Sequence, residues 1–473
     1  MDIENIIERN SEYSELFADL GKLLFNNESL QFLAFDEDKS KVSQFIDNFT
    51  YNVSPWPIII DERHLHKFNR IVDSTPPLLN KVLKAYIAHE PEYLKEYINI
   101  SSMTVERYKE HDFSSMEIMS RYDAVETDGV VKLVEINIGS SLGGWWSDWL
   151  YPEISQKLET VESVSQWNFK YRKISELSFK AVWQSIARIK GNQAQGNIFI
   201  YIPDSATTNL DSVHRNLHDT VMRVKPKSFT NGTLHIFDNL NELEWLQKGQ
   251  IKCRGFDVDA LLIPLMTGEE INESFFARLQ AYAQHEKFYY PDSELYRLLA
   301  NKLLFALLHD QKTQQFLTDV ERQFVQQHIP WSGKLNAAKQ LFKNQHIATE
   351  ELIERYQSQL VFKKSESMQG KDVIVGKSVS KQEWLEQYQV LREDNDWLIQ
   401  WFCEPDVLCC ADQRSGLSFY RIVWGIFGVN GKYGGSWCRG NPLSNNDTVI
   451  NLARGAVEFV VAESQPQKRK ITL

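Results

Sequence analysis

Three oxygen-bearing side chains stand at matched positions in two β-rich runs. Asp123 lies in IMSRYDAV, and Glu135 and Asn137 lie in VVKLVEINI; Asp128-Gly129 between these runs is a strong hairpin signal. Because side chains alternate along a strand, Glu135 and Asn137 share a face that Asp123 can join. Such hard oxygen ligands suit Mg²⁺, which also shares phosphate oxygens. The alternative is a solvent-facing strand edge that merely carries charge.

Lysines at three positions could bind a phosphate. Lys363 and Lys364 end the apolar run LVFKK, and the loop that follows contains Gly370. An alternating strand turns one of these two lysines inward and the other outward. Lys302 interrupts the apolar segment LLANKLLFALL, where a lysine must find a partner or extend to the surface. For each lysine, an exposed and merely solvated side chain is the alternative.

Two arginines and two glycine-rich segments complete the candidates. Arg121, two residues before Asp123, would point the same way and could contact an anion on the metal. Arg439 in SWCRGNP is ambiguous from its context alone. Neither glycine-rich segment is a P-loop: GKDVIVGKS encloses five residues between its glycines where Walker A needs four, and GNQAQGN has Asn197 in place of the lysine.

The elements that must position these residues fall into successive regions. Periodic segments over residues 1 to about 110, separated by the turn-rich NVSPWP and DSTPP, predict a mainly helical region. Strand-like GNIFIYIPD and VDALLIPLM alternate with helical segments, which is typical of a small parallel α/β layer. Residues 294–360 again read as helical, and mostly antiparallel strands follow. The fold class expected is therefore α+β.

Composition narrows the possible partners. The 473 residues include 52 Lys+Arg and 63 Asp+Glu, giving a net charge of −11, which argues against nucleic acid as a partner. No run of 18 apolar residues and no signal-peptide pattern occurs, so no membrane partner is expected. Five cysteines without CxxC spacing favour neither disulfides nor a zinc site. We expect a cytoplasmic protein.

Taken together, the motifs resemble the circularly permuted ATP-grasp enzymes, in particular the synthetase domain of the glutathionylspermidine synthase family. That family carries R-x-D followed by E-x-N, with twelve residues from Asp to Glu, as from Asp123 to Glu135 here. The match continues in chain order with Asn301-Lys302, Lys363, Gln400 and Arg439. The metal motif precedes the nucleotide lysines, the reverse of ordinary ATP-grasp enzymes. Lys364 departs from the family, which has Pro there.

The resemblance implies an ADP-forming carboxylate–amine ligase that uses ATP and Mg²⁺ and acts through an acylphosphate. Its substrates would be an amino acid, a small peptide or a polyamine-type amine. Arg121 would assist catalysis, and Mg²⁺ would be bound by Asp123, Glu135 and Asn137. ATP would be bound by Lys302, Lys363, Lys364, Gly370, Gln400 and Arg439. Alternatives are a peptide-modifying ligase on the same site and a nucleotide-binding relative without turnover.

The expected organisation follows from the same resemblance. Residues 115–145 and 395–455 should share one sheet, because metal ligands and nucleotide lysines must meet. The expected regions are a helical part (1–114), the metal-ligand hairpin with the α/β layer (115–293), a lid with the nucleotide lysines (294–410), strands completing the central sheet (411–460) and a frayed tail (461–473). The acid and amine substrates, the pathway and the oligomeric state do not follow from the sequence.

Overall fold

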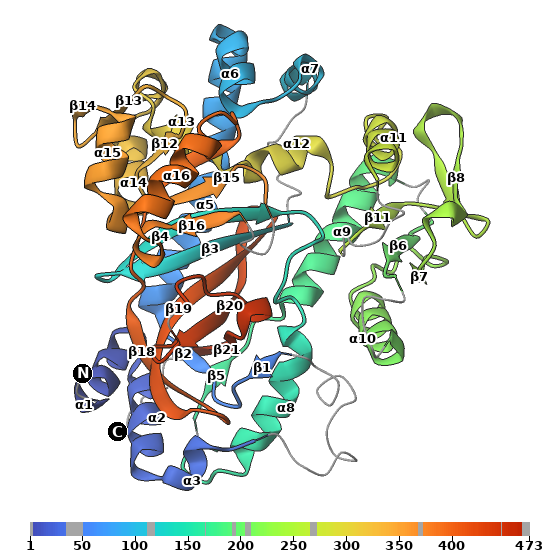
Figure 1. The fold of residues 1–473 in the computed structure, drawn as a ribbon. Coiled ribbons are helices and arrows are strands. Elements are labelled where there is room, and N and C mark those ends of the chain that lie inside the picture. The colour runs from blue at the N-terminus through green and yellow to red at the C-terminus, as the bar shows by residue number, and fades with distance from the viewer. Residues whose placement is uncertain are drawn as a thin grey trace.

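A nine-stranded sheet organises the centre of the molecule in the computed structural model (Figure 1). The structure describes residues 3–34, 51–110, 119–165, 167–191, 195–203, 210–264, 272–367, 372–445 and 447–465. The main path of the sheet runs β1 (Asn52–Val53), β21 (Val457–Ser464), β20 (Lys432–Pro442), β19 (Gly416–Val429), β3 (Met119–Thr127) and β4 (Val130–Ile138). Off this path lie β18 (Val407–Asp412), β2 (Ile58–Ile60) and β5 (Phe169–Lys170).

The β3–β4 hairpin confirms the expectation from Asp128-Gly129. Both turn residues have positive φ, 51° and 73°, as a tight hairpin turn of matching twist requires. Asp123 pairs with Glu135, whereas Ala124 pairs with Leu133, so Val134 is an extra residue that bulges from β4. The hairpin then joins the central sheet, since β3 pairs antiparallel with β19.

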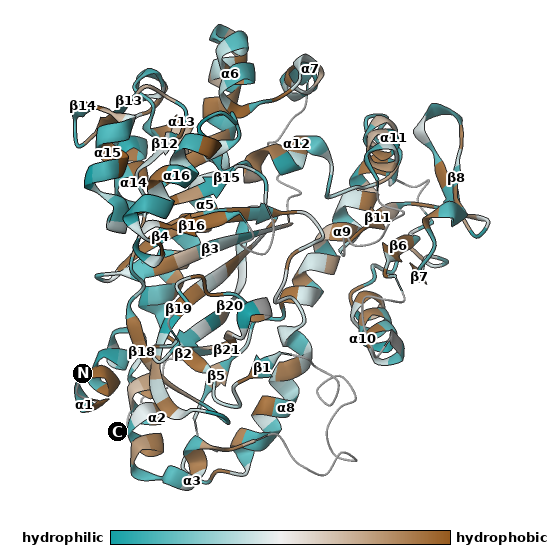
Figure 2. Ribbon diagram, in the orientation of Figure 1, coloured by the Kyte–Doolittle hydropathy of each residue, from teal (hydrophilic) through white to brown (hydrophobic). Residues whose placement is uncertain are grey.

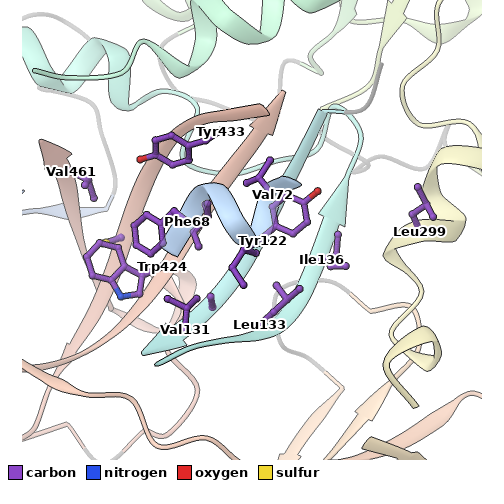
Figure 3. Close-up of a cluster of buried hydrophobic side chains, with 14 of the residues drawn as sticks. Phe68, Val72, Tyr122, Val131, Leu133, Ile136, Leu299, Trp424, Tyr433 and Val461 are labelled. Atoms are coloured by element: carbon purple, nitrogen blue, oxygen red, sulfur yellow. The ribbon is translucent and has the colours of Figure 1, made fainter. Parts of the chain in front are cut away.

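A large hydrophobic cluster lies on one face of this sheet, against the long helix α5 (Glu62–His89). Figure 3 shows Tyr122 from β3 and Trp424 from β19 close to Phe68 of α5. Asp61 caps this helix by accepting hydrogen bonds from the backbone N–H groups of its first turn. Because strand side chains alternate, the neighbours of these core residues along β3 and β19 face the other side, where the candidate site lies.

A four-stranded antiparallel sheet, hereafter the lid sheet, lies above the hairpin in Figure 1. Its order is β12 (Ser332–Lys334), β17 (Trp397–Trp401), β15 (Leu360–Lys364) and β16 (Val373–Val375). One face is apolar: Phe362 stacks on Trp384 of α16 (Lys381–Leu391) with ring centroids 3.7 Å apart. Figure 2 shows hydrophilic and hydrophobic residues alternating around α16 and α15 (Thr349–Arg355), as expected of helices that cover a sheet.

The predicted α/β layer is confirmed. Its strands β11 (Ala260–Leu262), β6 (Ile198–Tyr201) and β7 (Leu234–Phe237) are parallel. The helices nearby are α9 (Ile174–Lys190), α10 (Leu210–Arg223) and α11 (Glu273–Ala283), and a small antiparallel sheet contains β8 (Leu243–Trp245), β9 (Ile251–Cys253) and β10 (Phe256–Asp257). With separate helical and antiparallel parts, the chain as a whole is α+β.

The remaining elements complete the structure. At the amino-terminal side are α1 (Ile3–Arg9), α2 (Glu15–Asn26), α3 (Glu28–Gln31), α6 (Pro91–Ile98) and α7 (Ser102–Glu110). Further along lie α8 (Ser147–Glu159), α12 (Glu294–Arg297), α13 (Leu303–His309), α14 (Asp319–His328), and the hairpin of β13 (Lys339–Phe342) and β14 (Gln345–Ala348). No helix in the described part of the chain is long and apolar enough to span a membrane.

Several sequence-based expectations of the fold are wrong. The turn predicted at DSTPP is absent, because α5 continues through Pro76 and Pro77 and buries residues on both sides of them in the core. In the region expected to be mainly helical, β1 lies within NVSPWP and β2 directly follows it, and both strands pair with the distant β21. Strands β12–β14 interrupt the helical pattern expected over 294–360. The single sheet expected for residues 115–145 and 395–455 holds for β18–β20, but β17 belongs to the lid sheet.

Candidate functional site

A buried carboxylate, Asp123, receives hydrogen bonds from two arginines. Arg121 Nε lies 2.6 Å from Asp123 Oδ1, and Arg121 Nη2 lies 3.0 Å from Oδ2. Arg439 Nη2 also donates to Oδ2. Burial alone would raise the pKa of Asp123, but the two guanidinium groups outweigh it, and the pKa is lowered. Asp123 is therefore ionised and fully paired at neutral pH.

The register of the central sheet explains how Arg439 reaches Asp123, more than three hundred residues earlier in the chain. Asp123 pairs with Gly425, and Gly425 pairs with Trp437, so all three positions share one face. Arg439, two residues after Trp437, points the same way. Gly425 leaves space for Arg121, since a Cβ at position 425 would lie 3.0 Å from Arg121 Cδ.

The second carboxylate, Glu135, forms an ion pair with Lys302. The Nζ–Oε1 distance is 3.1 Å, and the Lys302 side chain is only 5% exposed. The expected helix is broken here: Asn301 has an extended backbone, and its side-chain oxygen accepts the N–H of Leu303 at 2.9 Å. Lys302 thus precedes α13, and its Nζ also donates to Ser367 O at 3.3 Å. The alternative of a snorkelling surface lysine is wrong.

Lys363 approaches the hairpin from the lid sheet. Its Nζ lies 3.0 Å from the backbone oxygen of the bulged Val134 and 2.8 Å from Gln400 Oε1. Gln400 in turn donates to Ser332 Oγ at 3.1 Å. The pKa of Lys363 is lowered to about 8, chiefly by burial; the charge on Glu135 opposes this shift, and the charge on Lys302 adds to it. Lys363 is thus a buried cation whose hydrogen-bond partners here are neutral oxygens.

The structure does not bring every expected ATP-binding residue into this cluster. Lys364 lies on the opposite face of the lid sheet, 38% exposed, with its Nζ 3.7 Å from Asp394. Strand alternation is the physical reason, and it identifies Lys363 as the lysine that faces inward. Gln400 is buried and already hydrogen-bonded through both ends of its amide. Gly370 lies outside the described residues.

The hairpin residues fit a magnesium site. Asn137 pairs with Arg121, and Glu135 pairs with Asp123. The two pairs are two residues apart along the strands, so all four side chains share a face. Asn137 Nδ2 and Arg439 Nε are buried and have no hydrogen-bond partner in the described part of the protein. Among the described residues, no three His, Cys, Asp or Glu side chains are grouped for a metal. Mg²⁺ needs only one or two carboxylates when phosphates and waters complete its shell, and two carboxylates and an amide meet that need.

Sequence reasoning missed Trp437, whose ring lies beside both arginines. The Arg121 and Arg439 Cζ atoms are 5.3 Å and 5.4 Å from its ring centroid. The position was detectable: in SWCRG, Trp437 precedes Arg439 by two residues on a strand and must share its face. Recognising both neighbours of the ring, however, required the pairing of β3 with β19 and β19 with β20.

Comparison with solved structures shows a related fold. A glutathione synthetase-like effector from Globodera pallida, solved in its apo form, superposes with a TM-score of 0.56. The two chains are 13% identical, and the match covers 98% of this chain and 97% of the other. A candidate gamma-glutamylcysteine synthetase from Methylobacillus flagellatus gives a TM-score of 0.39 at 12% identity, over 82% and 87% of the chains. Neither the protein-family models nor the curated proteins contain a match.

Proposed function

We propose that the protein is an ATP-dependent, ADP-forming carboxylate–amine ligase of the circularly permuted ATP-grasp type. The observation that carries the proposal is the meeting of Glu135, Lys302 and Lys363, from three distant segments, beside the Arg121–Asp123–Arg439 cluster. The fold shared with a synthetase-like protein is consistent with this proposal.

Charge supports a nucleotide triphosphate as the ligand. Arg121, Arg439, Lys302 and Lys363 exceed the carboxylates Asp123 and Glu135 by two positive charges, provided Lys363 is protonated, as it mostly is at neutral pH. ATP with one bound Mg²⁺ carries a net charge of about −2. The surplus therefore matches the charge of this ligand.

In the proposed complex, the carboxylates of these ion pairs would bind Mg²⁺ and the cations would bind phosphate. Asp123, Glu135 and Asn137 would hold Mg²⁺, which neutralises charge on the phosphates during transfer. Lys302 and Lys363 would bind phosphate oxygens, and Arg439 would bind at the γ-phosphate end. Arg121 would stabilise the transferring phosphoryl group by charge and position. Gln400 acts through Lys363, which it orients. The adenine would lie near residues 398–404.

The proposed reaction has two steps. An oxygen of the substrate carboxylate attacks the γ-phosphorus, the bond to the β-phosphate oxygen breaks, and ADP leaves. The amine nitrogen then attacks the acyl carbon of the acylphosphate, phosphate departs, and the amine gives up a proton to leave an amide. The buried cations would hold charged oxygens in place through both steps, where a water-exposed site would stabilise them less.

The test is product analysis with ATP, Mg²⁺ and mixtures of amino acids, small peptides and polyamines. We expect ADP and phosphate whenever a competent acid and amine are both present. AMP and pyrophosphate would contradict the proposal, because adenylation requires attack at the α-phosphate. Binding of MgATP without ADP release from any mixture would instead support a nucleotide-binding protein without turnover.

A further inference from the structure

The ring of Trp437 lies beside the two guanidinium groups that bind Asp123. Both Cζ atoms lie within about 5.4 Å of the ring centroid, a distance at which a cation is attracted to an aromatic face. Arginine is the cation best suited to this arrangement, because its planar guanidinium can stack while its N–H groups remain free to donate.

The surroundings of Trp437 are built to accommodate its ring. A Cβ at Gly425, the residue paired with Trp437 on β19, would lie 2.8 Å from the ring atom Cε3. A Cβ at Gly144 would overlap the indole, and Gly144 has a φ of +92°, which other residues rarely adopt. Trp146 packs edge-on against the ring, with centroids 6.3 Å apart. The Trp146 N–H is held by both oxygens of the buried Glu458, at 3.0 Å and 3.1 Å.

Asp123 cannot bind Mg²⁺ while both of its oxygens accept hydrogen bonds from arginines. In the structure, arginines occupy both of its oxygens, yet a carboxylate that binds Mg²⁺ must turn an oxygen to the metal. The guanidinium groups must then exchange hydrogen bonds to Asp123 for hydrogen bonds to phosphate. Their cation–π contact with Trp437 uses no N–H group and can persist through this exchange.

We propose that Trp437 is a positioning residue that holds Arg121 and Arg439 on its ring while their hydrogen bonds pass from Asp123 to the nucleotide. This inference rests on the proposed binding of MgATP. It adds a residue that contacts neither metal nor nucleotide and acts only through the arginines.

The test is the equilibrium affinity for MgATP, measured by titration calorimetry on wild type, Trp437→Phe and Trp437→Leu. Phenylalanine keeps an aromatic face, whereas leucine keeps only apolar volume. We expect Trp437→Leu to raise the Kd about tenfold and Trp437→Phe to raise it no more than about threefold.

Trp424→Phe is the matched control. Trp424 is the neighbour of Gly425 on β19 and faces the core, where it stacks on Tyr13 with centroids 5.8 Å apart. It should lower the melting temperature and leave the Kd unchanged. Wild-type affinity in Trp437→Leu, equal losses in its Phe and Leu variants, or an equal loss in Trp424→Phe would overturn the positioning role alone. No MgATP binding by wild type would overturn the proposed function as well.

Discussion

The hairpin and the lid sheet hold their charged groups in opposite ways. On the hairpin, the two carboxylates of the site are paired with cations: Asp123 with two arginines and Glu135 with Lys302. On the lid sheet, the buried ammonium of Lys363 is held by a backbone oxygen and a side-chain amide oxygen, and burial lowers its pKa. The carboxylates of the site are thus paired with cations without a ligand, whereas the ammonium of Lys363 has only neutral hydrogen-bond partners.

This difference suggests how the two regions divide the work of binding. A buried cation with only neutral partners loses hydration that a phosphate can replace. A carboxylate already bound to cations gains less from a metal unless those cations move to phosphate at the same time. We therefore expect the lid to contribute mainly to nucleotide affinity and the hairpin mainly to phosphoryl transfer.

The largest effect should come from the hairpin carboxylate Glu135. Glu135→Gln keeps the side-chain shape but removes a charge from the proposed metal site. We expect kcat for ADP release to fall at least about a hundredfold, as when one preorganised electrostatic group is lost. Glu126→Gln is the matched control, since Glu126 is buried in the same hairpin, faces the core and pairs with Lys67. If both variants keep wild-type turnover, the metal site is wrongly assigned.

Lys302 links the two regions, and its loss should change two constants. Lys302→Met removes a cation that, in the proposed complex, would hold phosphates in both the ground state and the transition state. We expect the KM for ATP to rise about tenfold and kcat to fall as well. Steady-state kinetics at varied ATP would measure both constants. An unchanged KM with a lowered melting temperature would reduce Lys302 to a structural partner of Glu135.

The pH dependence of binding should come from the lid. Lys363 has a lowered pKa of about 8, so it is charged below that pH and loses its charge as the pH rises through it. Because phosphate binds the charged form, we expect the Kd for MgATP to increase several-fold between pH 7 and pH 9. Lys363→Arg, whose guanidinium stays charged, should flatten this rise. Parallel pH profiles in the two proteins would assign the titration to another group.

The smallest effect is expected at Lys334, a second buried lysine on the same face of the lid sheet. Its Nζ donates to the backbone oxygens of Glu96 and Tyr97, at 2.9 Å and 2.8 Å, at the carboxyl end of α6. A lysine there satisfies helix-end carbonyls and complements the helix dipole. Lys334→Met should lower the melting temperature by about 2 °C and change the Kd for MgATP less than about twofold. A tenfold change in Kd would make Lys334 part of the nucleotide site.

Local sequence patterns were enough to predict which side chains of the hairpin share a face, but not which lysine of the lid sheet faces the hairpin. Asp128-Gly129 and strand parity placed Asp123, Glu135 and Asn137 on one face, because turn type and alternation act over a few residues. Parity along LVFKK left Lys363 and Lys364 equivalent. Only the pairing of β15 with β17, which brings Lys363 opposite Leu398, decides which lysine faces the hairpin.

Long-range packing also explains the larger errors. Pro76 and Pro77 predict a turn by local rules, yet they lie within α5 because the residues around them are buried in the core. Strand β12 is only three residues long and exists through its pairing with β17, which follows it by more than sixty residues. Such elements carry little local signal. In contrast, the order of the motifs along the chain, through the family resemblance, was enough to predict that the hairpin carboxylates and the lysines lie close together.

The affinity of two adjacent lysine variants for MgATP is the most direct test of the proposed nucleotide site. Lys363→Met and Lys364→Met make the same chemical change on opposite faces of one strand, and the Lys364 ammonium lies 3.7 Å from the exposed Asp394. In titration calorimetry at pH 7 we predict that Lys363→Met raises the Kd at least about tenfold, while Lys364→Met stays within about twofold of wild type. Equal affinities in the two variants, or a larger loss in Lys364→Met, would contradict a nucleotide held between the lid sheet and the hairpin.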